Sequence, residues 1–329
     1  QHEITQLVHF AAYKAVGESM QKPLRYWHNN VTGTSLLVQA ATDGGVRNVV
    51  FSSSCSVYGN PPIVPVDESA PIAPESVYAE TKAMSERILK WYDTTHGVSS
   101  VSLRYFNAAG ASFDGRIGED WAHAANLIPL VMKAALGAGP AVQVFGTDYP
   151  TPDGTGIRDY IHVDDLARAH VLALAYLAEG GTTTAVNVGT GIGSSVREVI
   201  AATEAASGRP VPFVDAPRRG GDPVTSFADA RRAEAVLGWK ANYGLREIID
   251  NGLTVRRNGG YDAFVLANSL EPGVVELREV LDIENESAAR LRFAPAVLQR
   301  CLDFEDWTKK HPTISPLSVL RNLVLLPWV

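Results

Sequence analysis

The sequence predicts an α/β fold: a doubly wound parallel sheet followed by a smaller α/β lobe. Over the first 108 residues, short apolar runs alternate with helical patterns, which is typical of parallel βαβ units. After Ala108 this alternation gives way to long loops rich in glycine and aspartate. The chain has 329 residues, 46% of them hydrophobic, so it can bury a full core in one large or two modest domains.

Three strands are expected in the first part of the chain. They are the apolar runs QLVHFAA at 6–12, RNVVFSSS at 47–54 and SVSLRYFN at 100–107. Crossover connections between parallel strands place the carboxyl ends of the strands at one edge of the sheet. The SSS and YFN ends should therefore meet at that edge, where ligands usually bind.

Helical patterns separate these strands. A long amphipathic stretch is expected over 16–41, and a second helix over 78–92. In the second helix Met84, Ile88 and Trp91 fall on one apolar face, since residues three and four apart stack on the same side of a helix.

Two long loops characterise the second part of the chain. GASFDGRIGED and FGTDYPTPDGTG are too long for tight turns, and such loops on an α/β scaffold tend to carry binding sites. AVNVGTGIGSSVREVI then predicts a strand, a glycine loop and a helix. The loop has G-x-G-x-G at Gly189, Gly191 and Gly193 rather than the G-x-G-x-x-G of dinucleotide sites, so a strand-to-helix turn is favoured over a cofactor loop.

Composition excludes several classes of function. The net charge is −7 and no basic run occurs, which argues against nucleic acid or an anionic membrane as the main partner. The two cysteines lie far apart, as in a reducing compartment, and no signal peptide or 18-residue apolar segment is present, so a cytoplasmic location is expected. His9, His28, His123 and His162 have no metal-ligand spacing, and no metal is expected.

The stretch SVYAETKAMSER places Tyr78 four residues before Lys82. On a helix the two side chains would stack one turn apart. A phenol has a reference pKa of about 10, and a nearby ammonium favours the phenolate, so the pair could supply a base near neutral pH. The alternative is a surface helix that carries both residues by chance, because this spacing alone is common.

Many separate motifs carry a resemblance to a known family. They are HFAAYKAVGES, NNVTGT, VFSSSCSVYG, VYAETK, LRYFNAAGA, NLIPLV, FGTDYPTPDGTGIRDYIHVDDLA, NVGTGIGSSV and APRRGGD. In this order, and over roughly residues 1–261, the chain resembles the UDP-glucose 4-epimerase family of the extended short-chain dehydrogenases/reductases. The resemblance implies a Rossmann-like sheet, tightly bound NAD and epimerisation of UDP-glucose and UDP-galactose through a 4-keto sugar.

The resemblance also assigns roles to particular residues. Tyr78 would exchange the proton of the sugar 4-hydroxyl, Ser54 would hold the same oxygen, and Lys82 would lower the pKa of Tyr78 and bind the nicotinamide ribose. With these three, the implied NAD contacts are Phe10, Ala11, Ala12, Lys14, Asn29 and Phe106. For Phe10 and Phe106, simple core packing is an equal alternative.

The resemblance also implies that cationic and amide side chains bind the nucleotide sugar. Besides Ser54 and Tyr78, the implied substrate-binding residues are Asn107, Asn126, Arg158, Arg219, Asp222 and Ser226. The planar guanidinium groups suit bidentate phosphate binding, although either arginine alone could be a solvated surface charge. Ser226 occupies the position beside the 2-substituent of the sugar, where a serine leaves room for an N-acetyl group that a tyrosine would exclude.

The ends of the sequence depart from the family pattern. The glycine-rich phosphate loop of the family lies before HFAAYKAVGES, so an N-terminally truncated Rossmann domain and weak NAD binding are expected of the chain as given. The expected division is residues 1–108 as the rest of the NAD-binding domain, 109–261 as mainly the nucleotide-sugar lobe with some segments returning to the first sheet, and 262–329 as an unrecognised extension. A homodimer is implied. Another nucleotide-sugar reductase (a dehydratase or decarboxylase) and a catalytically silent binding homologue stay open as alternatives.

Overall fold

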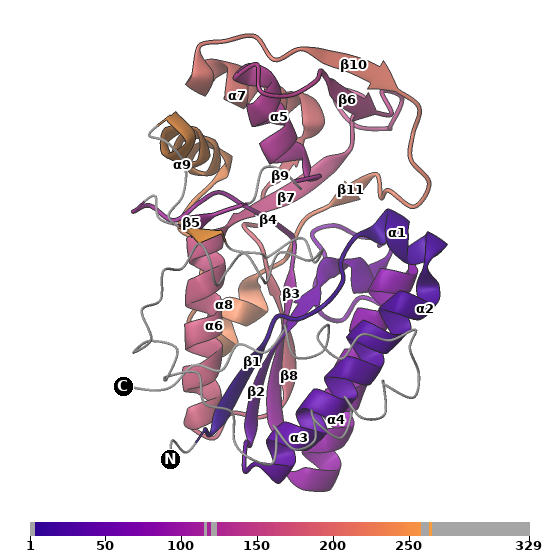
Figure 1. Cartoon of the computed structure of the whole chain (residues 1–329), viewed down its shortest axis with the longest axis vertical. Helices are drawn as coiled ribbons and strands as arrows, with labels where there is room; N and C mark the ends of the chain where they lie inside the picture. Colours follow the sequence, from indigo (N-terminus) through magenta and orange to yellow (C-terminus); the bar gives the residue numbers. More distant parts are fainter. Residues whose placement is uncertain (1–3, 115–116, 120–123, 258–262, 265–329) are drawn as a thin grey trace.

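A parallel four-stranded sheet forms the centre of the first part of the chain (Figure 1). The computed structural model describes residues 4–114, 117–119, 124–257 and 263–264. The strand order is β1-β2-β3-β8, and the strands are β1 (Gln6–His9), β2 (Asn48–Ser54), β3 (Ser99–Tyr105) and β8 (Thr184–Val188). All neighbouring pairs in this sheet are parallel, which confirms the predicted α/β fold.

Helices cover both faces of this sheet (Figure 1). The helices α3 (Gly33–Asp43) and α4 (Val77–His96) pack on one face, where they bury alternate strand residues such as Val49 and Phe51. The helices α6 (Val163–Ala178) and α8 (Arg231–Leu237) bury the residues of the other face, including Val50. This alternation follows from the two-residue repeat of a strand, and it explains why these runs are apolar throughout.

The stretch expected to be one amphipathic helix is divided into four elements. They are α1 (Val16–Gln21), α2 (Pro23–Tyr26), the π-helical segment η1 (Trp27–Thr32) and α3. Pro23 separates the first two because it has no backbone N–H to continue the preceding helix, whereas the first position of a new helix tolerates it. The expectation of one continuous helix was therefore wrong.

Helix α4 begins and ends with recognisable caps. The Ser76 hydroxyl accepts a hydrogen bond from the Ala79 N–H at 3.2 Å, and Gly97 ends the helix with a φ of +64°. The helix therefore extends beyond the predicted 78–92 at both ends. The apolar face predicted from the sequence does not pack on the sheet, since Trp91 is 68% exposed, and the buried face instead carries small and polar residues together with Leu89.

A second sheet begins where β3 leaves off. Its order is β11-β7-β4, and β9 pairs with β7 in the antiparallel direction. The strands are β4 (Asn107–Ala109), β7 (Ile157–His162), β9 (Gly193–Ser195) and β11 (Thr225–Ser226). Strand β4 starts two residues after β3 ends, so this sheet continues directly from the carboxyl edge of the first.

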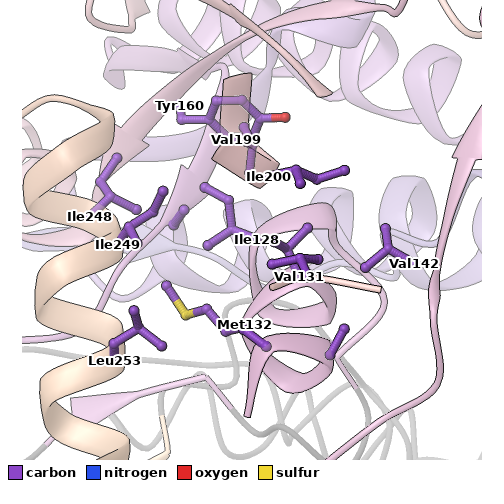
Figure 2. Close-up of a cluster of buried hydrophobic side chains, with 14 of the residues drawn as sticks. Ile128, Val131, Met132, Val142, Tyr160, Val199, Ile200, Ile248, Ile249 and Leu253 are labelled. Carbon is purple, nitrogen blue, oxygen red and sulfur yellow. The ribbon is translucent and has the colours of Figure 1, made fainter. Parts of the chain in front are cut away.

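The second lobe has its own apolar core (Figure 2). Ile128 and Met132 on one helix face Val199 and Ile200 on a second and Leu253 on a third. The elements not yet named are η2 (Cys55–Tyr58), β5 (Ile117–Gly118), α5 (Leu127–Ala135), β6 (Val142–Phe145), α7 (Val196–Ser207), β10 (Phe213–Ala216), α9 (Leu245–Arg257) and β12 (Ala263–Phe264). Strand β6 pairs with β10, and β5 with β12.

The chain returns to the first sheet after entering the second lobe. Helix α6, strand β8 and helix α8 all belong to the first sheet or its cover, although they follow β4 and β7 in sequence. The proposed domain limits at 108 and 261 stay a prediction, and of the expected extension at 262–329 only β12 belongs to the described residues. No helix within the described parts of the chain is long and apolar enough to cross a membrane.

Candidate active site

The carboxyl edge of the first sheet gathers the predicted catalytic residues. Ser54 ends β2, Tyr105 ends β3, and Tyr78 lies in the first turn of α4 with Lys82 one turn further on. Parallel strands and the helix that follows them place these side chains together, as the sequence predicted. The Nζ atom of Lys82 lies 5.9 Å from the centre of the Tyr78 ring.

Lys82 is buried beneath this edge. Only 3% of the residue is exposed, and its Nζ donates a hydrogen bond of 2.6 Å to the Ser52 carbonyl and lies 4.9 Å from the centre of the Phe51 ring. Burial lowers the pKa of Lys82 to about 7, and the nearby charge of Glu86 opposes that change. At neutral pH the ammonium is therefore only partly populated.

The pKa of Tyr78 is shifted in the opposite direction from the one expected. Burial raises the pKa of Tyr78 to about 12, and its interaction with the Ser54 hydroxyl lowers it only in part. The expectation that Lys82 brings this pKa towards neutrality was wrong for the structure as it stands, because burial disfavours the charged form of both groups. Tyr78 is thus a phenol at neutral pH and can donate a proton.

Ser54 is held in place by the short helix that follows it. Its Oγ accepts hydrogen bonds from the N–H of Ser56 at 3.2 Å and from the Ser56 hydroxyl at 2.9 Å. Gly59 then turns the chain with a φ of +60°, and a Cβ there would lie 2.1 Å from the Ala73 carbonyl oxygen, so only glycine fits. The Ser54 hydroxyl also forms a hydrogen bond with Tyr78, which joins the two residues at the sheet edge.

The segment after β1 matches what part of a dinucleotide site needs. Phe10 is 45% exposed, so the core-packing alternative does not describe it, and Ala11 and Ala12 are half-buried small residues. Lys14 is half-buried too, and burial lowers its pKa to about 8. An aromatic ring, two small residues and a cation along one sheet edge fit the central part of NAD.

Asn30, which holds this segment in place, was not predicted from the sequence. Its Oδ1 accepts from the Tyr13 N–H at 2.8 Å, and its Nδ2 donates to the Tyr13 carbonyl at 2.9 Å and to the Thr81 hydroxyl at 3.0 Å. The Thr81 hydroxyl in turn donates to the Tyr78 carbonyl at 2.7 Å. Asn30 is 2% exposed and lies in the π-helical segment, so it ties the cofactor-side loop to the helix turn of the Tyr-Lys pair.

The neighbouring Asn29 and the aromatic Phe106 lie in different surroundings. Asn29 is half-buried, and its Nδ2 donates to the Oδ1 of Asn30 at 2.9 Å. Phe106 is 6% exposed and packs with Val57 and Tyr58 in an apolar cluster. For Phe106 the core-packing alternative therefore describes its side chain.

A second aromatic group lies beside Phe10. His170 of α6 has its ring 4.6 Å from that of Phe10, and its Nε2 forms a short hydrogen bond with the Tyr105 hydroxyl. Burial lowers the pKa of His170 to about 4, so it is neutral at physiological pH. This group was not found from the sequence, because its members come from three distant segments.

Three predicted substrate residues meet around β7. In the sheet register Ser226 of β11 lies opposite Arg158, and the Asn107 Nδ2 donates to the Asp159 carbonyl at 3.0 Å. Ser226 is 8% exposed and interacts with Cys55, the residue next to Ser54. The predicted specificity position thus borders the predicted catalytic serine.

The remaining predicted substrate residues lie on the exposed part of the second lobe. Arg219 donates through Nε to Asp222 at 3.0 Å, and its guanidinium lies 4.5 Å from the Phe145 ring centre. Asn126 is exposed and precedes α5 without a side-chain cap. Asp222 therefore orients Arg219. Within the described part of the chain, no hydrogen bond or ion pair joins these three residues to Tyr78.

The glycine loop at 189–193 is not at the first sheet edge beside β1. It joins β8 to the short strand β9, which leads into α7, so the expected direct turn from strand to helix was wrong. Among the described residues, no group of three or more His, Cys, Asp or Glu side chains is placed to hold a metal ion.

A parallel α/β sheet with serine, tyrosine and lysine side chains at its carboxyl edge is the arrangement of a short-chain dehydrogenase/reductase. The model of the NAD dependent epimerase/dehydratase family matches residues 1–189, and the chain belongs to this family. It is 48% identical over 261 residues to the UDP-glucose 4-epimerase of Rhizobium meliloti, covering 79% of this chain and 80% of the relative.

Two solved structures extend the comparison. The UDP-glucose 4-epimerase of Stenotrophomonas maltophila, solved with bound NAD and formylated UDP-arabinopyranose, is 45% identical with a TM-score of 0.74, over 77% of this chain and 76% of that one. The UDP-Glc/GlcNAc 4-epimerase of Campylobacter jejuni is 38% identical with a TM-score of 0.65, over 76% and 77% of the two chains.

Proposed function

We propose that this protein interconverts UDP-glucose and UDP-galactose by NAD-dependent epimerisation at carbon 4 of the sugar. The observation that carries the proposal is the convergence of Ser54, Tyr78 and Lys82 at one sheet edge. Relatives that are about 45% identical over three quarters of the chain, and carry that enzyme name, support it.

Tyr78 and Ser54 handle the proton of the reaction. Tyr78 takes the proton of the 4-hydroxyl as the sugar is oxidised and returns it when the 4-keto sugar is reduced, while Ser54 holds the reacting oxygen. Bound NAD would supply the acceptor and later the donor of the hydride of carbon 4, so no net oxidation would occur. Because burial raises the pKa of Tyr78 to about 12, the phenolate that accepts the proton is disfavoured in the protein alone, and it needs the positive charge that Lys82 carries when protonated.

The other residues hold the two ligands. Phe10, Ala11, Ala12, Lys14 and Asn29 would contact NAD, with Lys82 at the ribose, and the buried Phe106 would support that site from below. Asn107, Asn126, Arg158, Arg219 and Asp222 would hold the diphosphate and uridine while the sugar turns over. The expected lack of a glycine-rich loop, the weak NAD binding that would follow from it and the cytoplasmic location stay predictions.

Conversion of UDP-galactose, with NAD added, tests the proposal directly. Tyr78→Phe should lower kcat by about 100-fold or more, because it removes the acid/base group. Tyr92→Phe is the matched control: Tyr92 lies on the same helix, and its hydroxyl contacts Gln39 at 2.8 Å, away from the sheet edge. A 4-keto-6-deoxy sugar as product would identify a dehydratase, and CO₂ released from a UDP-uronic acid assayed in parallel would identify a decarboxylase. UDP binding without turnover of any of these substrates would identify a silent homologue.

We propose in addition that the enzyme accepts N-acetylated substrates. Ser226 is small, interacts with Cys55 and lies opposite Arg158, so it does not itself occupy the space that a tyrosine side chain would fill. The Campylobacter jejuni relative, which is named for both sugars, shows that this fold can carry both activities. Turnover of UDP-N-acetylgalactosamine by the wild type, lost in Ser226→Tyr while UDP-galactose is still converted, is the expected result; retention in the variant would contradict it.

A homodimer is proposed from the outer face of α3 and α4. These helices lie side by side (Figure 1). Leu36 on α3 is 40% exposed and Trp91 on α4 is 68% exposed, and α4 also carries the half-buried Met84 and Ile88. Light scattering after gel filtration should give twice the chain mass for the wild type and a monomer for Trp91→Lys. Val171→Lys is the control, because Val171 is 62% exposed on α6, at the opposite face of the sheet. A monomeric wild type would refute the dimer.

A further inference from the structure

Asp159 lies at the centre of the second sheet, where the substrate residues meet. It is fully buried, with none of its surface exposed, and its neighbour Arg158 pairs with Ser226 of β11. On its other side it pairs with Gly193 of β9. Its main-chain carbonyl accepts the hydrogen bond of 3.0 Å from the Asn107 side chain. Asp159 therefore contacts or adjoins two predicted substrate residues, Asn107 and Arg158, and Arg158 pairs with a third, Ser226.

The carboxylate of Asp159 joins two segments that are far apart in sequence. Its Oδ1 accepts from the Thr190 N–H at 2.9 Å and the Thr190 hydroxyl at 2.6 Å. Its Oδ2 accepts from the N–H groups of Gly191 at 3.0 Å and Ala228 at 3.1 Å. Burial raises the pKa of Asp159, and these hydrogen bonds act against that rise. All four donors are neutral, so the buried charge depends on this arrangement.

The glycine loop is fitted closely to this carboxylate. A Cβ at Gly189 would lie 2.5 Å from Oδ2 of Asp159 and 2.7 Å from the Cβ of Ala228. A shift of the glycine loop, or of the segment after Ser226, would break a hydrogen bond to Asp159 or cause a steric clash. Two of the three glycines that resemble a cofactor loop in sequence, Gly189 and Gly191, thus serve a carboxylate of the protein itself.

We propose that Asp159 is a positioning residue for the nucleotide-sugar site. By fixing the Ala228 backbone, two residues beyond Ser226, and by accepting the Asn107 side chain, it sets the relative positions of Ser226, Arg158 and Asn107. This inference rests on the proposed function, since it assumes that the three residues contact the nucleotide sugar. It concerns binding of the substrate rather than the transfer of the proton or hydride, because Asp159 does not touch Ser54, Tyr78 or Lys82.

Asp159→Asn tests the proposal. An amide nitrogen cannot accept a hydrogen bond, so two of the four donors lose their acceptor and the segments at 190–191 and 226–228 loosen. We expect the dissociation constant for UDP, measured by calorimetry, and the KM for UDP-galactose to rise about tenfold, which corresponds to a loss of about 1.4 kcal/mol. We expect kcat to fall less than threefold, NAD content to stay unchanged and hydrogen exchange to increase in peptides covering 190–191 and 226–228.

Asp165→Asn is the matched control. Asp165 is also fully buried, and its carboxylate accepts from the N–H groups of Asn242 and Tyr243 and pairs with Arg168. Its partners Arg168, Asn242 and Tyr243 are different from those of Asp159, so this variant should lose stability without a change in UDP affinity. If both variants weaken UDP binding equally, the effect of Asp159 is general destabilisation and the proposal is overturned.

A milder variant keeps the test valid if Asp159→Asn does not fold. Thr190→Val removes only the hydroxyl that donates to Oδ1, and a rise of about threefold in the UDP dissociation constant is expected, or about 0.6 kcal/mol. Unchanged UDP affinity in both Asp159→Asn and Thr190→Val would refute the positioning role of Asp159 and leave the proposed function standing. A wild type that binds UDP but does not epimerise UDP-galactose would refute the proposed function and leave the positioning role of Asp159 standing.

Discussion

Replacement of Lys82 by methionine should abolish turnover and yet stabilise the fold. Lys82 is 3% exposed, and its pKa is lowered from 10.5 to about 7 by burial, so the folded state disfavours its ammonium. At about 1.4 kcal/mol for each pKa unit, that displacement costs the fold about 5 kcal/mol wherever the group is charged in both states. Methionine removes this cost, fills similar volume and forfeits the hydrogen bond to the Ser52 carbonyl, worth about 1 kcal/mol.

The stabilisation expected from Lys82→Met should decrease as the pH rises. For a lysine whose folded-state pKa is depressed, the cost is full below pH 7 and disappears as the pH rises towards 10.5. The gain from Lys82→Met in the free energy of unfolding should therefore be about 3 kcal/mol at pH 7 and about 1 kcal/mol at pH 9. Every other titratable group is present in both proteins. The difference between their curves of unfolding free energy against pH therefore reports the titration of Lys82.

Urea unfolding followed by tryptophan fluorescence at pH 7, 8 and 9 measures this difference. Lys90→Met is the matched control, because Lys90 is exposed on the same helix and its replacement should change stability by less than about 0.5 kcal/mol at every pH. A Lys82→Met protein that is less stable than the wild type, or a difference that does not change between pH 7 and 9, would refute the reasoning.

Two further predictions concern buried polar side chains. Asn30→Ala should lower the free energy of unfolding by about 3 kcal/mol, because three hydrogen bonds to Tyr13 and Thr81 are lost, and urea unfolding with calorimetric NAD titration would check that NAD binding weakens as well. Arg104→Met should cost about 3 to 5 kcal/mol, because Arg104 binds Glu86 through two hydrogen bonds, of 3.0 and 2.6 Å, and its loss leaves a buried carboxylate unpaired. Equal stability of Arg104→Met and the wild type in urea would contradict the second.

The strands and the catalytic edge could be predicted because their signals are local. A buried parallel strand is an apolar run such as RNVVFSSS, and its last residue lies at the ligand edge wherever the strand sits in the sheet. The spacing of Tyr78 and Lys82 likewise fixes their relation within one helix. These features need no knowledge of distant residues, and the structure places them as the sequence indicates.

The buried face of α4 and the pKa of Tyr78 could not be predicted, because both depend on what packs around the helix. Met84, Ile88 and Trp91 look like a core stripe, but the sheet buries Ala79, Ala83 and Leu89 instead. Small residues let the helix approach the strands closely, and that approach removes water from Tyr78. The resulting burial outweighs the effect expected from the nearby ammonium.

Asn30 and Asp159 escaped notice for a related reason. Asn30 bonds residues 17 positions before it and 51 after it, and Asp159 bonds residues 31 and 69 positions away. In the sequence each is one ordinary polar residue inside a longer motif. Their importance arises only when the fold supplies several donors or acceptors to one buried side chain.

Lys82 and Asp159 show two different outcomes of burying a charge. The carboxylate of Asp159 accepts four hydrogen bonds, as many as its two oxygens readily hold. The ammonium of Lys82 has three N–H donors, and the described residues give it a single acceptor, the Ser52 carbonyl. A structural role favours the first arrangement, because every unmade hydrogen bond of a buried charge costs stability. The arrangement around Lys82 leaves N–H donors available at the sheet edge, as a lysine that binds ligand hydroxyls requires. The gain in the free energy of unfolding expected for Lys82→Met measures the stability cost of this arrangement.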